Sequence, residues 1–123
     1  MTVLFRFRLL AALLAISAGI LLQPDAARAE AGEVQTVWRL LDYVAVDYGG
    51  AVANGRVTSA SEYAEMTEFA ATVRTSIAAL PPSAARARLL SEAEALQSSI
   101  AAKATPDTVA QRARGLSSDL LVA

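Results

Sequence analysis

Apolar residues recur every three or four positions in four successive segments of this 123-residue chain. Such spacing places them along one face of an α-helix, which turns once every 3.6 residues. Each apolar stripe is too narrow to be buried alone, so the sequence predicts an all-α fold, a small antiparallel four-helix bundle. The four sets are Val34, Val37, Trp38, Leu41, Val44, Ala45 and Tyr48; Tyr63, Met66, Ala70, Val73, Ile77 and Leu80; Leu89, Ala93, Leu96 and Ile100; and Val109, Ala113, Leu116 and Leu120.

The connection between the first two predicted helices carries both stop and start residues. Gly49-Gly50 is expected to end the first helix. Asn54-Gly55 indicates a turn, but only one short apolar run flanks it, so we expect a loop and no strands. Ser59 and Glu62 fit a capping box, in which Ser59 accepts from the Glu62 amide and the Glu62 side chain bonds the Ser59 amide.

The last two helices are also delimited by residue type. Pro81-Pro82 stops the second helix, and Ser83 can cap a third helix that runs to about Lys103. Thr105-Pro106-Asp107 combines an N-cap, a first-turn proline and a first-turn acid, which together predict a fourth helix.

Two aromatic side chains are expected on the buried sides of their helices, and two charged side chains on the exposed side of theirs. Trp38 and Phe69 are expected in the core, because large aromatic rings are usually buried. Arg88 and Glu92 lie four residues apart and are expected to pair on the outside of the third helix.

Residues 1–29 have the three-part pattern of a secretory signal peptide. Arg6 and Arg8 precede the uncharged stretch 9–22, and small residues occupy positions 27 and 29. Fourteen apolar residues are fewer than the ~20 that span a bilayer, so we expect cleavage after Ala29, with an uncleaved anchor as the alternative. Residues 30–123 would then form a helical periplasmic domain.

The composition excludes several classes of function. From residue 30 onward there are 8 basic and 11 acidic residues, a net charge of −3 that argues against a nucleic-acid partner. There is no cysteine and no histidine, so haem attachment within this chain is excluded. The same absence removes the usual general base, thiol nucleophile and zinc ligands, and we expect no enzyme and no catalytic residues.

The remaining donors are oxygens, which suit hard ions such as ferric iron or calcium. The first candidate pair is Glu62 and Glu65, because helical residues three apart can direct two carboxylates at one ion. The alternative is structural: Glu62 caps the helix, and Glu65 is a solvated acid near the positive end of the helix dipole.

A second candidate set lies on the first helix. Asp42, Tyr43, Asp47 and Tyr48 supply oxygens beside an apolar stripe, and a carboxylate with a phenol can bind ferric iron. The alternative is that each tyrosine buries its ring and keeps its hydroxyl in water. Val46 on the same outer side suggests a docking surface.

The strings LLDYVAVDYGGAV (40–52) and EYAEM (62–66) together resemble the extracytoplasmic N-terminal region of bacterial iron permeases that carry a fused cytochrome c domain. The similarity covers roughly residues 34 to 122. The resemblance implies partnership with the permease membrane domain and the cytochrome c domain, and a periplasmic location, membrane-associated through the permease.

In that family a haem-binding CxxCH segment and membrane helices with arginine-glutamate-x-x-glutamate iron motifs follow the leader region. This chain contains neither, so it is expected to be a fragment or a separately encoded leader module. Glu62 and Glu65 have the family's glutamate spacing, but Ser61 stands where the motif has arginine. We therefore expect an accessory module of iron ion transport that presents iron or docks the haem and permease domains. The alternative is a ligand-free structural or protein-interaction spacer.

Overall fold

The structure is a computed structural model that describes residues 32–123, so the predicted signal peptide lies outside the described residues. The N-terminal helix covers residues 32–51. It is followed by strands β1 (Val52–Ala53) and β2 (Arg56–Val57) and by helices α2 (Ala60–Ala78), α3 (Ala84–Ala101) and α4 (Pro106–Leu121). None of the helices in this part of the chain is both long enough and apolar enough to cross a membrane.

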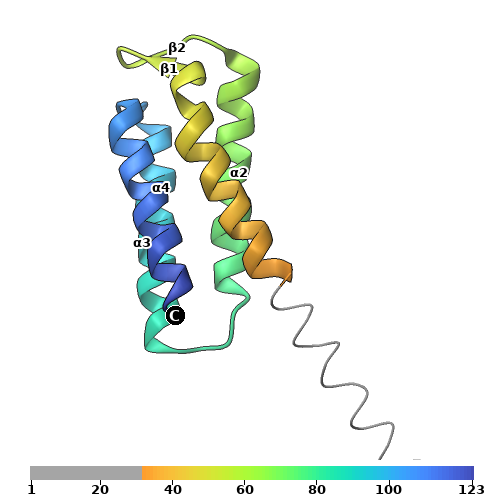
Figure 1. Ribbon diagram of the computed structural model, residues 1–123. Coiled ribbons are helices and arrows are strands. Elements are labelled where there is room, and N and C mark those ends of the chain that lie inside the picture. The colour runs from red at the N-terminus through yellow and green to blue at the C-terminus, as the bar shows by residue number, and fades with distance from the viewer. Residues whose placement is uncertain (1–31) are drawn as a thin grey trace, which may run out of the picture. The chain divides into compact units, whose positions relative to one another are not determined.

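Successive helices run in opposite directions (Figure 1). The N-terminal helix leads to the end of the bundle that carries β1 and β2, α2 returns, α3 leads back and α4 returns again. The predicted antiparallel four-helix bundle is confirmed, and its core is formed mainly by the predicted stripes. The buried members are Val37, Leu41, Val44, Tyr48, Met66, Ala70, Val73, Ile77, Leu89, Ala93, Leu96, Ile100, Val109, Ala113, Leu116 and Leu120.

The predicted N-caps of α2, α3 and α4 are confirmed. The hydroxyl of Ser59 accepts from the amide of Glu62 at 3.3 Å, and that of Ser83 accepts from Arg86 at 2.9 Å. Thr105 likewise accepts from Thr108 at 3.3 Å. Each hydroxyl satisfies one of the first amides of its helix, which have no partner within the helix itself.

The reciprocal half of the predicted capping box is not formed. The Ser59 amide donates to the carbonyl of Ala51 at 3.4 Å, and the Glu62 carboxylate lies beside Gly50 instead. The expected end of the first helix at Gly49-Gly50 is also wrong by one or two residues, because helical structure continues through residue 51.

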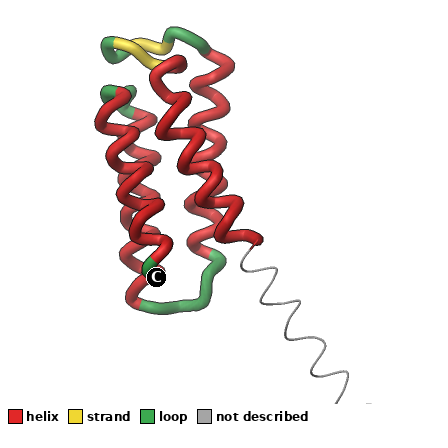
Figure 2. The backbone as a smooth tube through the Cα atoms, viewed as in Figure 1, coloured by secondary structure: helices red, strands yellow, loops and turns green. Residues whose placement is uncertain are grey.

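The predicted loop at Asn54-Gly55 is a small β-hairpin (Figure 2). β1 and β2 pair antiparallel, with Val52 opposite Val57. Asn54 and Gly55 have φ values of 54° and 72°, and two successive positive values are the requirement of a tight two-residue hairpin turn. The second strand contributes only one apolar residue, Val57, so the sequence shows no second apolar run after the turn. The buried side chain of Val52 anchors the hairpin to the bundle.

Two tyrosine hydroxyls fasten the hairpin end of the bundle, which comprises β1, β2 and the turn between α3 and α4. Tyr48 donates to the carbonyl of Ala104 at 2.8 Å, and Tyr63 donates to that of Ile100 at 2.9 Å. Lys103 adopts a φ of 54° just beyond the end of α3, and the Ile100 carbonyl accepts from the Lys103 amide at 3.0 Å as well as from Tyr63. The N-terminal helix and α2 are thus both tied to the end of α3.

At the opposite end, an arginine closes the loop between α2 and α3. The Arg86 guanidinium donates to the carbonyls of Ala78 and Leu80, each at 3.3 Å. The carbonyl of Ala78 lacks a helical partner because Pro82, four residues on, has no amide hydrogen, and Leu80 lies beyond the end of α2. Arg86 thus contacts the backbone of the preceding loop and helix end.

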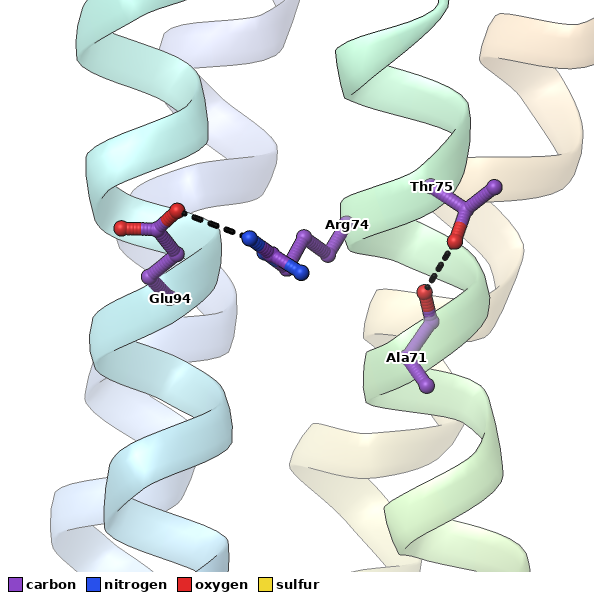
Figure 3. Close-up of polar contacts among 4 residues, drawn as sticks. All are labelled: Ala71, Arg74, Thr75 and Glu94. Atoms are coloured by element: carbon purple, nitrogen blue, oxygen red, sulfur yellow. Dashed lines mark hydrogen bonds and ion pairs between the residues drawn. The ribbon is translucent and has the colours of Figure 1, made fainter.

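An exposed ion pair also links α2 and α3. Figure 3 shows Arg74 reaching from α2 to Glu94 on α3, with a nitrogen to oxygen distance of 3.2 Å. The same figure shows the Thr75 hydroxyl donating to the carbonyl of Ala71 one turn earlier, at 3.0 Å. Because both charges of the ion pair are half exposed, its net contribution to stability is small.

Two predicted side-chain placements and one predicted ion pair differ from expectation. Trp38 is 45% exposed, because it lies at the edge of the apolar stripe, where the N-terminal helix faces a groove. Phe69 is only partly buried and packs against the core from its margin. Glu92 does not pair with Arg88 on the outside of α3. It is partly buried and faces Asp119 of α4.

Candidate functional site

Three of the four predicted acidic ligands line one open hollow. Asp47 comes from the N-terminal helix, and Glu62 and Glu65 come from the start of α2. Val46, Gly50 and Met66 complete the lining, and the hollow measures about 420 Å³. Because the hairpin folds α2 back beside the N-terminal helix, residues 15 to 18 positions apart in the sequence face the same space.

Gly50 allows the Glu62 carboxylate to sit close to the N-terminal helix. A Cβ atom at position 50 would lie only 2.7 Å from Oε2 of Glu62, so a larger residue there would require the flexible Glu62 side chain to move away. With glycine there, the carboxylate rests against the backbone. The sequence reasoning read Gly50 as a helix terminator and therefore missed this role, which only the packing of two helices reveals.

The electrostatic character of the hollow is negative. Its lining contains three acidic side chains and no basic one. Glu62 lies in the first turn of α2, where the positive end of the helix dipole offsets part of the repulsion between the carboxylates. Such a surface attracts cations and repels anions.

The hollow is not a closed metal site. Within residues 32–123, no three acidic side chains are grouped closely enough to hold one ion between them. Glu62 and Glu65 are both exposed, so their side chains are free to change rotamer. The arrangement can therefore hold a hydrated cation through one or two carboxylates, and binding of that kind is weak and readily reversed.

Asp42, the fourth predicted ligand, lies elsewhere. It lines a groove between the N-terminal helix and α4, together with Trp38 and Leu121. Five positions separate Asp42 from Asp47, which is well over one helical turn and places the two carboxylates on different sides of the helix. The structure therefore separates Asp42 from the other three acids.

The two tyrosines of the second candidate set have other roles. Tyr48 is buried, and its hydroxyl is already committed to Ala104. Burial, with Tyr63 nearby, raises the pKa of the Tyr48 phenol, which disfavours the phenolate that would bind ferric iron. Tyr43 is 44% exposed, and its ring lies 6.0 Å from that of Phe69. Neither phenol reaches the acidic hollow.

The groove that Trp38 lines is the second concave feature of the bundle. It measures about 290 Å³, and most of its lining is apolar. Leu121, 68% exposed, forms its margin on α4, where Arg114 stands opposite Asp42. Sequence reasoning placed Trp38 in the core, so it missed this groove. The position of Trp38 at the edge of its apolar stripe was the one sequence feature that could have indicated its exposure.

Comparison with known proteins places the chain in a family. The family model described as the iron permease-associated 4-helix bundle domain matches residues 24–121. No curated protein and no solved structure matches the chain significantly. The match covers most of the sequence and all four helices, and the observed architecture agrees with its description. The chain therefore belongs to the iron permease-associated four-helix bundle domain family, and its role lies in an iron permease system.

Proposed function

We propose that this bundle presents iron to its permease through the acidic hollow formed by Asp47, Glu62 and Glu65. The observation that carries the proposal is that three carboxylates, from two helices, line one open hollow in a domain whose family is associated with iron permeases. Iron is the cargo in this proposal, and it is not a structural component of the fold.

The openness of the hollow supports transfer of iron more than storage. Carboxylate oxygens are suitable donors for iron ions, and ferric iron in particular prefers hard ligands. A presenting site must release its ion to the next site, so it needs only modest affinity and fast exchange. The exposed Glu62 and Glu65 side chains meet both needs, because water can replace either carboxylate without disturbing the core.

We further propose that the module works in the periplasm, beside the permease membrane domain and a cytochrome c domain. The signal-peptide pattern of residues 1–29 supports export. The proposal includes no chemical reaction by the module itself, because the chain has neither cysteine nor histidine to act as nucleophile or base near neutral pH.

A second candidate function, docking of the haem and permease domains, is favoured by the groove between the N-terminal helix and α4. Trp38 and Leu121 are exposed large apolar residues that border this groove, and Asp42 and Arg114 give it charges of opposite sign. Tryptophan and arginine, which this groove supplies as Trp38 and Arg114, are among the residues that most often anchor protein interfaces. Docking and presentation use different faces, so both can operate in one module.

Calorimetric titration with ferrous iron under anaerobic conditions, and with citrate-chelated ferric iron, tests the presentation proposal. We expect micromolar to submillimolar binding by the wild type and at least tenfold weaker binding by a Glu62→Gln, Glu65→Gln double variant. The matched control is Glu94→Gln, Asp107→Asn, which removes the same charge from α3 and α4 and should bind like the wild type.

Two results would contradict iron presentation. If the folded wild type binds no iron, the hollow is not a metal site, and a ligand-free spacer or docking module remains. If both double variants lose affinity equally, binding reflects net charge and not the hollow. Circular dichroism on each variant ensures that the comparison is made between folded proteins.

A further inference from the structure

A pair of acidic side chains meets between α3 and α4, away from the acidic hollow. Glu92 of α3 is partly buried, and the Asp119 carboxyl group on α4 is the acidic side chain that faces it. The Oε2 atom of Glu92 is fully buried and has no hydrogen-bond partner among the described residues. Two carboxyl groups can hydrogen bond to each other only when one of them carries a proton.

The charged neighbours of the pair are few. From α4, the group facing Glu92 is Asp119, and from its own helix it is Arg88, one turn earlier. Within the described residues, Arg74 and Glu94 form the ion pair that links α2 and α3. Among residues 32–123 no ion pair joins α3 to α4, and Glu92 and Asp119 are the acidic side chains that face each other there.

We propose that Glu92 and Asp119 share one proton across the α3–α4 interface, and that losing it loosens the last turns of α4 and alters the Trp38 groove. With the proton present, a carboxyl group donates to a carboxylate and joins the two helices. Without it, two negative charges face each other beside a buried oxygen that has no donor, which is unfavourable.

The link to the groove follows from the geometry of α4. Ser117, Ser118 and Leu121 line the groove, whereas Asp119 points largely to the other side of the same last turns. A change in how Asp119 holds this segment to α3 therefore moves one wall of the groove. The opposite wall carries Trp38, the only tryptophan of the chain, whose fluorescence reports on the groove directly.

Electrostatics place the transition near neutrality. Burial, followed by the neighbouring Asp119 carboxyl, raises the pKa of Glu92 to about 7, and Arg88 only partly opposes this rise. An unfolded chain would titrate Glu92 at its ordinary value of 4.5. The folded state therefore binds the proton more tightly, and the bundle loses stability as the pH rises from about 4.5 through about 7.

Carbon-13 NMR of the glutamate side-chain carboxyl carbons in the full chain, titrated from pH 4 to 9, tests the shared proton. We expect the Glu92 resonance, assigned by its loss in Glu92→Gln, to titrate near pH 7, at least one unit above exposed glutamates. In Asp119→Asn the midpoint should fall but stay above the ordinary value, because burial remains. In the control Glu94→Gln it should not move.

Acrylamide quenching of Trp38 over the same pH range tests the coupling to the groove. We expect quenching to rise through the Glu92 transition in the wild type, and to stay constant with pH in Glu92→Gln. A Glu92 midpoint below pH 5 would overturn the shared proton. A midpoint near 7 with unchanged quenching would overturn the effect on the groove. Glu92→Gln should fold, because an amide can donate to Asp119 without carrying charge.

Discussion

The two ends of the bundle are built differently. At the hairpin end, a buried and a partly buried tyrosine donate hydrogen bonds to backbone carbonyls of another helix or turn, and a two-stranded hairpin joins the N-terminal helix to α2. At the other end, a single arginine holds the loop between α2 and α3, and exposed Trp38 and Leu121 border a groove. One end is closed by specific polar bonds, whereas the other leaves apolar surface available.

The two ends therefore contribute unequally to the stability of this small domain. A chain without disulfides must rely on packing and on hydrogen bonds that are shielded from water. The hairpin end provides these bonds, and it also positions Glu62 and Gly50 for the acidic hollow. The groove end can then tolerate exposed apolar residues that contribute little to the core.

The largest expected effect comes from breaking the hairpin end at Tyr48. Replacement Tyr48→Ala removes a buried ring and its bond to Ala104, and should lower the free energy of unfolding by about 3–4 kcal/mol. The matched change at the groove end, Trp38→Ala, should cost about 1 kcal/mol or less, because the ring is half exposed. Urea denaturation followed by circular dichroism measures both. Equal losses would show that the two ends do not differ as described.

A smaller effect is expected when the loop at the groove end loses its arginine. Arg86→Met keeps an aliphatic stem of similar length but removes the donors to Ala78 and Leu80, and should cost about 1 kcal/mol. Arg112→Met on α4 is the control for loss of charge, and should change the urea midpoint by much less. An Arg86 variant as stable as the control would mean that water satisfies these carbonyls equally well.

The smallest effect is expected for the ion pair on the side of the bundle. Arg74→Met breaks the contact with Glu94, and should change the free energy of unfolding by only about 0.3 kcal/mol, because both charges are well solvated. A double-mutant cycle with Glu94→Gln isolates the pair. A coupling energy well above 1 kcal/mol would mean that this ion pair between α2 and α3 stabilises the bundle as much as the contacts at its ends do.

Helix positions were predictable because local chemistry determines them. The N-caps Ser59, Ser83 and Thr105 act within three residues of themselves, so their sequence patterns identified the helix starts. The buried face of α3 followed from periodicity alone. The hairpin was missed because its second strand is two residues long and supplies only Val57 as an apolar residue.

The candidate site was predictable only in part, because it depends on contacts between helices. The spacing of Glu62 and Glu65 was visible in the sequence. The sequence did not show that the Asp47 side of the N-terminal helix lies next to α2 or that the Asp42 side lies next to α4. The close approach at Gly50 and the contact between Glu92 and Asp119 join residues 12 and 27 positions apart. No local rule predicts which distant side chain a partly buried acid will face.

The bond from Tyr48 to Ala104 also has a consequence for the order of assembly. It joins residues 56 positions apart, whereas α2, α3 and α4 meet their chain neighbours through short turns. Closing a long loop costs more chain entropy than closing a short one, so contacts between sequence neighbours form first during folding. The bond between Tyr48 and Ala104 is therefore expected to form late, after neighbouring helices, including the N-terminal helix and α2 across the hairpin, have paired.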